Sequence, residues 1–272
     1  MPNRASKKRN AAKKRGGRAP KPTGGGPRSS MPARASIIGE AEFTSPRPGG
    51  RKYRVIETNE VDRYEPMGPK PGVLSPAFIA AKPLPTGDAY RGHDRRAAKL
   101  SIAKAPVERF ADVKELLATL PAVSVMKQHK PPIKTDKKSR RVAEERRNVR
   151  VRAFLYAASR ESDNDFHLII GRSTRARRPV YMTMEISGLP PARSASFARL
   201  KAARKAYKNF FGAALPGFGY KFYRPPVPVE IEGSLFFDAT HARGEPPGPQ
   251  TLRRDMPTIW EVHPVTRIVF EP

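Results

Sequence analysis

Four short stretches in the C-terminal half of the chain interrupt apolar sequence with acids and histidines. In the first, DNDFH, Asp163, Asp165 and His167 are two residues apart and share one face of an extended strand. The others place Glu185 in YMTMEISG, Asp238 and His241 in FFDATH, and Glu261 and His263 in IWEVHPV. Carboxylates with imidazoles suit Mn²⁺, Zn²⁺, Fe²⁺ or Mg²⁺, and equally a metal-free acid–base pair.

If the strands that carry these residues are neighbours, the sequence predicts one polar cluster at the rim of a barrel. The expected metal ligands are Asp165, His167, Asp238, His241 and His263, and the expected catalytic residues are Glu185 and Glu261. No pair follows a known metal-binding interval, and each stretch alone fits a structural histidine or a turn. A divalent metal cofactor is one alternative, and a purely structural cluster is the other.

Apolar patterns predict which elements position these residues. Strands are expected at 148–159, 165–171, 179–188, 227–241 and 258–270, with a bulge at Gly233 and an amphipathic helix at 194–211. Three strands, a helix and two more strands are the order of a small five-stranded OB-like barrel. The predicted fold is mainly β with one or two helices, and the alternative is an open antiparallel sheet crossed by one helix.

The N-terminal half is expected to hold little regular structure. Residues 1–39 contain eleven Lys or Arg and no acid, so they cannot bury enough apolar surface to fold. An exception is PVERFADVKELLATLP at 106–121, where apolar spacing and the opening proline predict a helix. The predicted organisation is a disordered basic tail at 1–51, an irregular linker with a short strand at 52–105, a helix with a basic linker at 106–147, and an OB-like domain at 148–272.

The charge distribution predicts a polyanion, first of all nucleic acid, as a partner. The formal net charge is +28, yet residues 150–272 hold 19 basic and 11 acidic side chains, so most of the excess lies upstream. In the predicted domain, the expected phosphate contacts are Arg172, Arg175, Arg177, Arg178, Lys201, Lys205 and Lys208. The alternative is a solubilising tail that binds nothing in particular.

Several classes of function are excluded by what the sequence lacks. The chain has no cysteine, which removes disulfides, thiolate metal sites and cysteine nucleophiles. No apolar run approaches the roughly 20 residues of a membrane span, and no apolar core follows the basic N-terminus as in a secretory signal. A cytoplasmic protein without a membrane partner is the expectation. Walker, dinucleotide-binding and nucleophile-elbow motifs are also missing.

The stretches DNDFHLIIG, MTMEISG, EGSLFFDATHA and WEVHPVTRI together resemble an uncharacterised bacterial domain with the pattern D-x-D-x-H, F-F-D, a downstream His and E-x-H-P. The resemblance covers residues 148–270 and implies an OB-like fold and the polar set above, without a known activity. The chain departs from that pattern by a basic insertion at 172–179. Two carboxylates entering an early strand are also similar to staphylococcal-type nucleases, but no motif assigns the phosphate-flanking arginines of those enzymes here.

Two functions follow from these patterns. The first is a nucleic-acid-associated binding module made of an OB-like domain and a basic tail. The alternative is a metal-dependent hydrolase, a phosphodiesterase or nuclease, that uses the His/Asp/Glu cluster at the barrel rim. Binding ranks first because it requires no particular geometry from the cluster.

Overall fold

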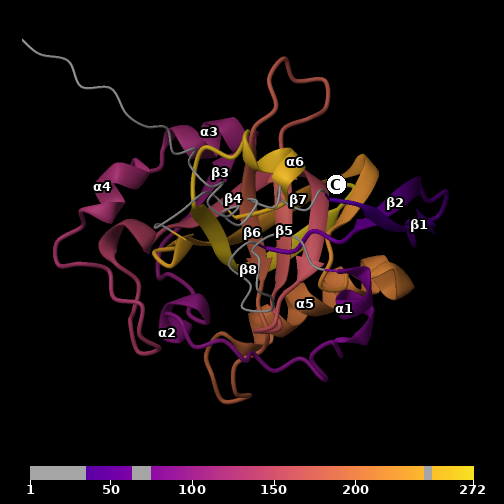
Figure 1. Cartoon of the computed structure of the whole chain (residues 1–272). Helices are drawn as coiled ribbons and strands as arrows, with labels where there is room; N and C mark the ends of the chain where they lie inside the picture. The colour runs from indigo at the N-terminus through magenta and orange to yellow at the C-terminus, as the bar shows by residue number, and fades with distance from the viewer. Residues whose placement is uncertain (1–34, 63–74, 242–246) are drawn as a thin grey trace, which may run out of the picture. The chain divides into compact units, whose positions relative to one another are not determined.

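The computed structural model describes residues 35–62, 75–241 and 247–272, which carry eight strands in one mixed sheet (Figure 1). The strands are β1 (Ile37–Thr44), β2 (Lys52–Thr58), β3 (Val107–Phe110), β4 (Asn148–Arg160), β5 (Phe166–Gly171), β6 (Tyr181–Ile186), β7 (Lys221–Phe237) and β8 (Trp260–Phe270). Their order is β1-β2-β7-β8-β6-β5-β4-β3, and β7 also pairs with β4. This additional pairing closes β4, β5, β6, β8 and β7 into a ring.

The prediction of a small five-stranded OB-like barrel is wrong, because the sheet continues beyond the ring. The hairpin of β1 and β2 joins the first residues of β7, and β3 lies parallel to β4 at the other end of the sheet. One or two helices were expected, but the described residues contain α1 (Pro76–Ala81), α2 (Arg96–Lys99), α3 (Val113–Ala118), α4 (Val123–Lys127), α5 (Phe197–Phe211) and α6 (Gln250–Arg253). The sheet extends beyond the ring because the 17-residue β7 is long enough to pair with β2, β4 and β8.

Two N-terminal predictions need correction. The strand β1 lies within the segment 1–51 that was assigned to the disordered tail, whereas residues 1–34 are outside the described part. The helix predicted at 106–121 is instead strand β3 followed by the short helix α3. Val107–Phe110 pairs with the start of β4, and the Asp112 side chain accepts a hydrogen bond from the backbone N–H of Lys114 to cap α3.

The helix predicted at 194–211 and the bulge at Gly233 are confirmed. Helix α5 follows β6 and buries Tyr207, Phe210 and Phe211 in the main hydrophobic core. The register of β7 against β8 shifts on both sides of Gly233, where a Cβ atom would lie 2.4 Å from the carbonyl oxygen of Pro264. The backbone approach at this position therefore requires glycine.

Both faces of the central strands are buried, and this arrangement creates the polar site. One face of β5, with Phe166, Leu168 and Ile170, belongs to the main hydrophobic core. Because side chains alternate along a strand, His167 points to the opposite face, yet it too is fully buried. Segments from the N-terminal half cover this second face. The backbone N–H of Tyr90 donates to Leu189 O at 3.0 Å, and that of Arg91 to Asp163 O at 2.8 Å.

A buried ion pair anchors the covering segment. The two terminal guanidinium nitrogens of Arg95 donate hydrogen bonds of 2.6 and 2.8 Å to the Glu145 carboxylate, and both side chains are at most 1% exposed. Arg95 directly precedes α2, and α2 ends at Lys99. The ion pair therefore fixes the helix that carries Lys99 into the polar face of the sheet.

Candidate metal centre

Strand register brings three of the sequence-predicted residues together. His167 on β5 is paired with Glu185 on β6, and Glu261 on β8 is paired with Thr183, two residues before Glu185. Paired residues, and residues two apart on one strand, share a face of the sheet. His167, Glu185 and Glu261 therefore converge on the covered polar face, where each is at most 1% exposed.

Ligand atoms of the polar residues approach one another in four overlapping groups. Within each group, one ligand atom from each residue lies within 4.8 Å of the others. The groups are Asp62/Glu161/His167, Asp165/Glu185/His263, His167/Glu185/Glu261 and Asp238/His241/Glu261. The third group, which we call the central triad, shares one member with each of the other three. Every metal ligand expected from sequence belongs to this network.

Several potential ligand atoms of the central triad have no hydrogen-bond partner among the described residues. The Nε2 atom of His167 and both carboxylate oxygens of Glu261 are buried, and none of them forms a hydrogen bond with any described residue. Leaving such atoms unsatisfied in a protein interior costs roughly 1–3 kcal/mol each, and more for a charged group. A bound cation would satisfy these atoms by coordinating them.

Tyr220 orients the His167 ring. Its hydroxyl lies 2.8 Å from Nδ1 of His167, and both side chains are completely buried. In the tautomer in which Nδ1–H donates to the tyrosine oxygen, Nε2 carries the lone pair and forms no hydrogen bond to a described residue. Partners of this type fix the orientation of metal-bound imidazoles.

Asp165 and His263 form a second group with Glu185. The Nδ1 atom of His263 is 2.6 Å from a Glu185 oxygen, and its Nε2 atom is 3.4 Å from Oδ2 of Asp165. The other oxygen of Asp165 accepts a hydrogen bond of 2.6 Å from the backbone N–H of Gly188. That bond fixes the carboxylate and leaves Oδ2 facing the imidazole.

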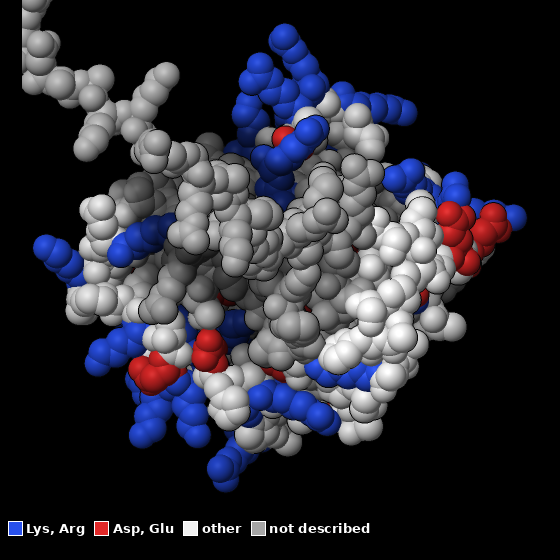
Figure 2. All heavy atoms as spheres, viewed as in Figure 1, with Lys and Arg blue, Asp and Glu red and all other residues white. Residues whose placement is uncertain are grey.

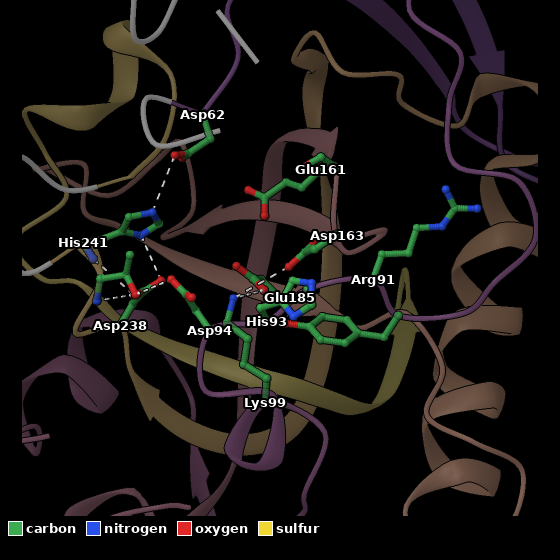
Figure 3. A pocket seen from close by; sticks show the side chains of 14 residues that line it. Asp62, Arg91, His93, Asp94, Lys99, Glu161, Asp163, Glu185, Asp238 and His241 are labelled. Atoms are coloured by element: carbon green, nitrogen blue, oxygen red, sulfur yellow. Dashed lines mark hydrogen bonds and ion pairs between the residues drawn. The ribbon is translucent and has the colours of Figure 1, made fainter. Parts of the chain in front are cut away.

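The site opens into a pocket of about 400 Å³ (Figure 3). Its lining includes Glu185, Asp163 and Lys99, together with Asp62, Asp94, Glu161, Asp238, His241, Tyr90 and His93. The Lys99 ammonium points among the acids, 3.7 Å from Glu185 and 3.9 Å from Asp163. Both distances exceed hydrogen-bond length, so Lys99 balances charge without occupying the carboxylate oxygens.

Burial sets the protonation states of the central residues. It lowers the pKa of His167 and of His263, so both imidazoles are neutral at pH 7, as metal ligation requires. Burial, reinforced by neighbouring acids, raises the pKa of Asp165 and Glu261 well above the usual range. Desolvation opposes ionisation of Glu185 as well, but His263 and Lys99 outweigh it and hold its pKa well below its ordinary value.

His241 and Asp238 form an ion pair at the pocket wall. The Nδ1 atom of His241 lies 3.0 Å from Oδ2 of Asp238, and its Nε2 atom lies 3.8 Å from Asp62. Desolvation would lower the pKa of His241, but the charge of Asp238 outweighs it and raises the pKa to about 9. The same contact holds the pKa of Asp238 well below its usual value, although its burial acts in the opposite direction.

The predicted position of the cluster, a barrel rim, is wrong. The residues lie on the face of β5, β6 and β8 opposite the main hydrophobic core, beneath the covering segments, because β5 and β6 are buried on both faces. Glu185 and Glu261 were expected to act as catalytic residues, whereas both occupy ligand positions in the network. Sequence reasoning missed Asp62, Tyr90, Lys99, Glu161 and Tyr220. Three of these five residues come from the segment 52–105. No sequence pattern in that segment indicated that it would cover a face of the sheet.

The predicted phosphate-binding residues divide into paired and exposed groups. Arg172 forms an ion pair with Asp112 at 2.8 Å, and Lys208 forms one with Asp88 at 3.1 Å. Arg175, Arg177, Arg178, Lys201 and Lys205 are exposed. Figure 2 shows basic side chains gathered over the loop that projects between β5 and β6. This loop follows Gly171, whereas Asp165 precedes β5, so the loop and the pocket lie at opposite ends of the strand.

The chain matches no family model, no curated protein and no solved structure. The resemblance to an uncharacterised bacterial domain therefore stays a prediction. Across the described ranges, no helix combines the length and the apolar character needed to cross a lipid bilayer.

Proposed function

We propose that this protein is a metal-dependent hydrolase that cleaves phosphodiesters in the pocket above the central triad. The observation that carries the proposal is the convergence of His167, Glu185 and Glu261 with buried ligand atoms that form no hydrogen bond to described residues. Nitrogen and oxygen donors of this kind suit Mn²⁺, Fe²⁺ or Zn²⁺. A cytoplasmic location is part of the proposal, since a chain without cysteine has no need of an oxidising compartment.

The charge of the pocket supports a cation as its first ligand. Carboxylates dominate the lining and outnumber its two basic side chains, Arg91 and Lys99. An anionic phosphodiester would be repelled by these acids unless positive charge were added first. A bound divalent cation would supply that charge and stabilise the charge that develops on the phosphate oxygens.

Two further residues have roles in this proposal. Lys99 is held on the rigid end of α2, where its ammonium could contact a phosphate oxygen. Asp163 lines the pocket, and burial raises its pKa, which suits a group that accepts a proton from water near neutral pH.

The experiment is hydrolysis of bis(p-nitrophenyl) phosphate by untagged protein, before and after removal of metal with EDTA and after addition of Mn²⁺. We expect activity that EDTA abolishes and Mn²⁺ restores, and that the Glu261→Gln variant lacks. Activity that survives EDTA, or that is equal in Glu261→Gln, would remove the proposal. A Glu108→Gln variant, altered at an exposed acid far from the pocket, is the matched control.

Nucleic-acid binding is a second candidate function, supported by the exposed arginines of the β5–β6 loop. Arg175, Arg177 and Arg178 are all exposed and lie close together in this loop of the chain. Basic side chains in such a loop could hold a phosphate backbone without reading its sequence. Nucleic acid is also a phosphodiester, so the two candidates are compatible.

A further inference from the structure

We propose that the centre holds two divalent cations side by side, with Glu185 as the bridging carboxylate. The inference rests on the proposed metal-dependent function and adds a second ion to it. Glu185 belongs both to the central triad and to the group with Asp165 and His263. Each cation would then be bound by one imidazole, one carboxylate of its own and one oxygen of Glu185.

The two proposed halves of the centre, one for each cation, contain the same kinds of metal-ligand atom. One half offers His167 and Glu261, and the other offers His263 and Asp165. All four side chains are fully buried. The atoms Nδ1 of His263, which is the ring nitrogen nearer Glu185, and Oδ2 of Asp165 form no hydrogen bond within the described chain, as is also true of Nε2 of His167 and both oxygens of Glu261. Buried donors are thus left over on both sides of Glu185.

The balance of charge favours two ions over one. Six carboxylates take part in the four overlapping groups, and Lys99 is the ammonium beside them. With all six carboxylates ionised, Lys99 and His241 (in its ion pair with Asp238) offset two charges, so one divalent cation would leave two formal negative charges and two cations would leave none. Uncompensated charge is expensive in a buried site, so the second cation makes the cluster less costly to bury.

Glu185 also has the position that a bridging ligand needs. It belongs to both ligand groups and lines the pocket, so two ions held by it would face a substrate together. Paired metal sites of this kind act on phosphate esters by contacting both the attacking and the leaving oxygen.

The test is Mn²⁺ titration of metal-free, untagged full-length protein, followed by calorimetry and electron paramagnetic resonance. We expect two Mn²⁺ per chain and the multiline spectrum of a magnetically coupled pair. His263→Ala and His167→Ala should each bind one Mn²⁺ and lose the coupling, whereas His129→Ala, altered outside the cluster, should retain both ions. Glu185→Gln should lose the coupled spectrum.

Two results would overturn the pair. The first is a single Mn²⁺ per chain in the wild type, a measurement that depends on no variant folding correctly. The second is loss of an ion in His241→Ala but not in His263→Ala, which would place the second ion with Asp238. If one Mn²⁺ binds and EDTA-sensitive hydrolysis persists, the proposed function stands while the pair fails. If no Mn²⁺ binds, both fail.

Discussion

His167 and Glu185 stand directly opposite each other on the antiparallel strands β5 and β6. Their side chains lie on the face of the sheet that points away from the main hydrophobic core, and Glu261 joins them from β8. The site is therefore a consequence of strand register, and a shift of β5 by one residue would turn His167 toward the apolar core.

Lys99 gives a prediction about catalysis. Lys99→Met should lower kcat for bis(p-nitrophenyl) phosphate by about 100-fold, because removing one preorganised charge from a transition state costs about that much. Mn²⁺ binding should be retained, since Lys99 is not among the ligand groups. Steady-state kinetics and calorimetry measure the two effects. Lys104→Met, at an exposed position, is the control. An unchanged kcat in Lys99→Met would refute the role of Lys99.

The pair of His241 and Asp238 gives a prediction about pH. The folded state raises the pKa of His241 from 6.5 to about 9, so the folded protein holds this proton more tightly than the unfolded chain. Its contribution is complete below pH 6.5 and disappears as the pH rises through about 9. Denaturant unfolding in EDTA should show that the wild type loses about 3 kcal/mol more over this range than His241→Gln. Parallel pH profiles of the two proteins would contradict the assignment.

The buried pair of Arg95 and Glu145 gives a prediction about stability. Arg95→Met should reduce the free energy of unfolding by about 3–5 kcal/mol, because it leaves the Glu145 carboxylate buried without its partner. Arg147→Met breaks the exposed pair with Glu108 and should cost about 1 kcal/mol or less. Urea denaturation compares the two variants. Equal losses would show that burial of the Arg95 pair has no particular importance.

The basic loop gives a prediction about nucleic-acid binding. Affinity for duplex DNA should fall with salt, and replacing Arg175, Arg177 and Arg178 by Ala should reduce the slope of log K against log salt by about 1 per lost phosphate contact. Fluorescence anisotropy at several salt concentrations measures the slope. A variant with Lys134, Lys137 and Lys138 changed to Ala removes the same charge elsewhere on the surface. Equal slopes in the two variants would mean that the loop has no specific role.

The sequence predicted the parts of the site that lie on strands, since period-two alternation is visible in residues such as Asp165 and His167. It also predicted α5 from the spacing of Leu200, Tyr207 and Phe211. Apolar alternation cannot reveal what covers the second face of a strand, however, and for this reason Lys99 and Asp62 were missed. Strand β1 was missed because it lies in a segment that was judged by its basic composition, and β3 was missed because its pairing depends on β4, much later in the chain.

The proline-initiated segment at 106–121 shows how tertiary pairing overrides local pattern. Its apolar spacing suits a helix, but hydrogen bonding of Val107–Phe110 to β4 fixes the first part as a strand. Asp112 then starts a helix of six residues. Local propensity was therefore right for only the second half of that segment.

The most direct test of a metal centre is to measure the metal bound by untagged wild-type protein and by Glu261→Gln after both are incubated with Mn²⁺ and desalted. Because Glu261 contributes two buried oxygens to the central triad, we predict stoichiometric Mn²⁺ and a raised melting temperature for the wild type, and less bound Mn²⁺ with a smaller rise in melting temperature for the variant. A wild-type protein that retains no Mn²⁺ and whose melting temperature does not change would contradict the account.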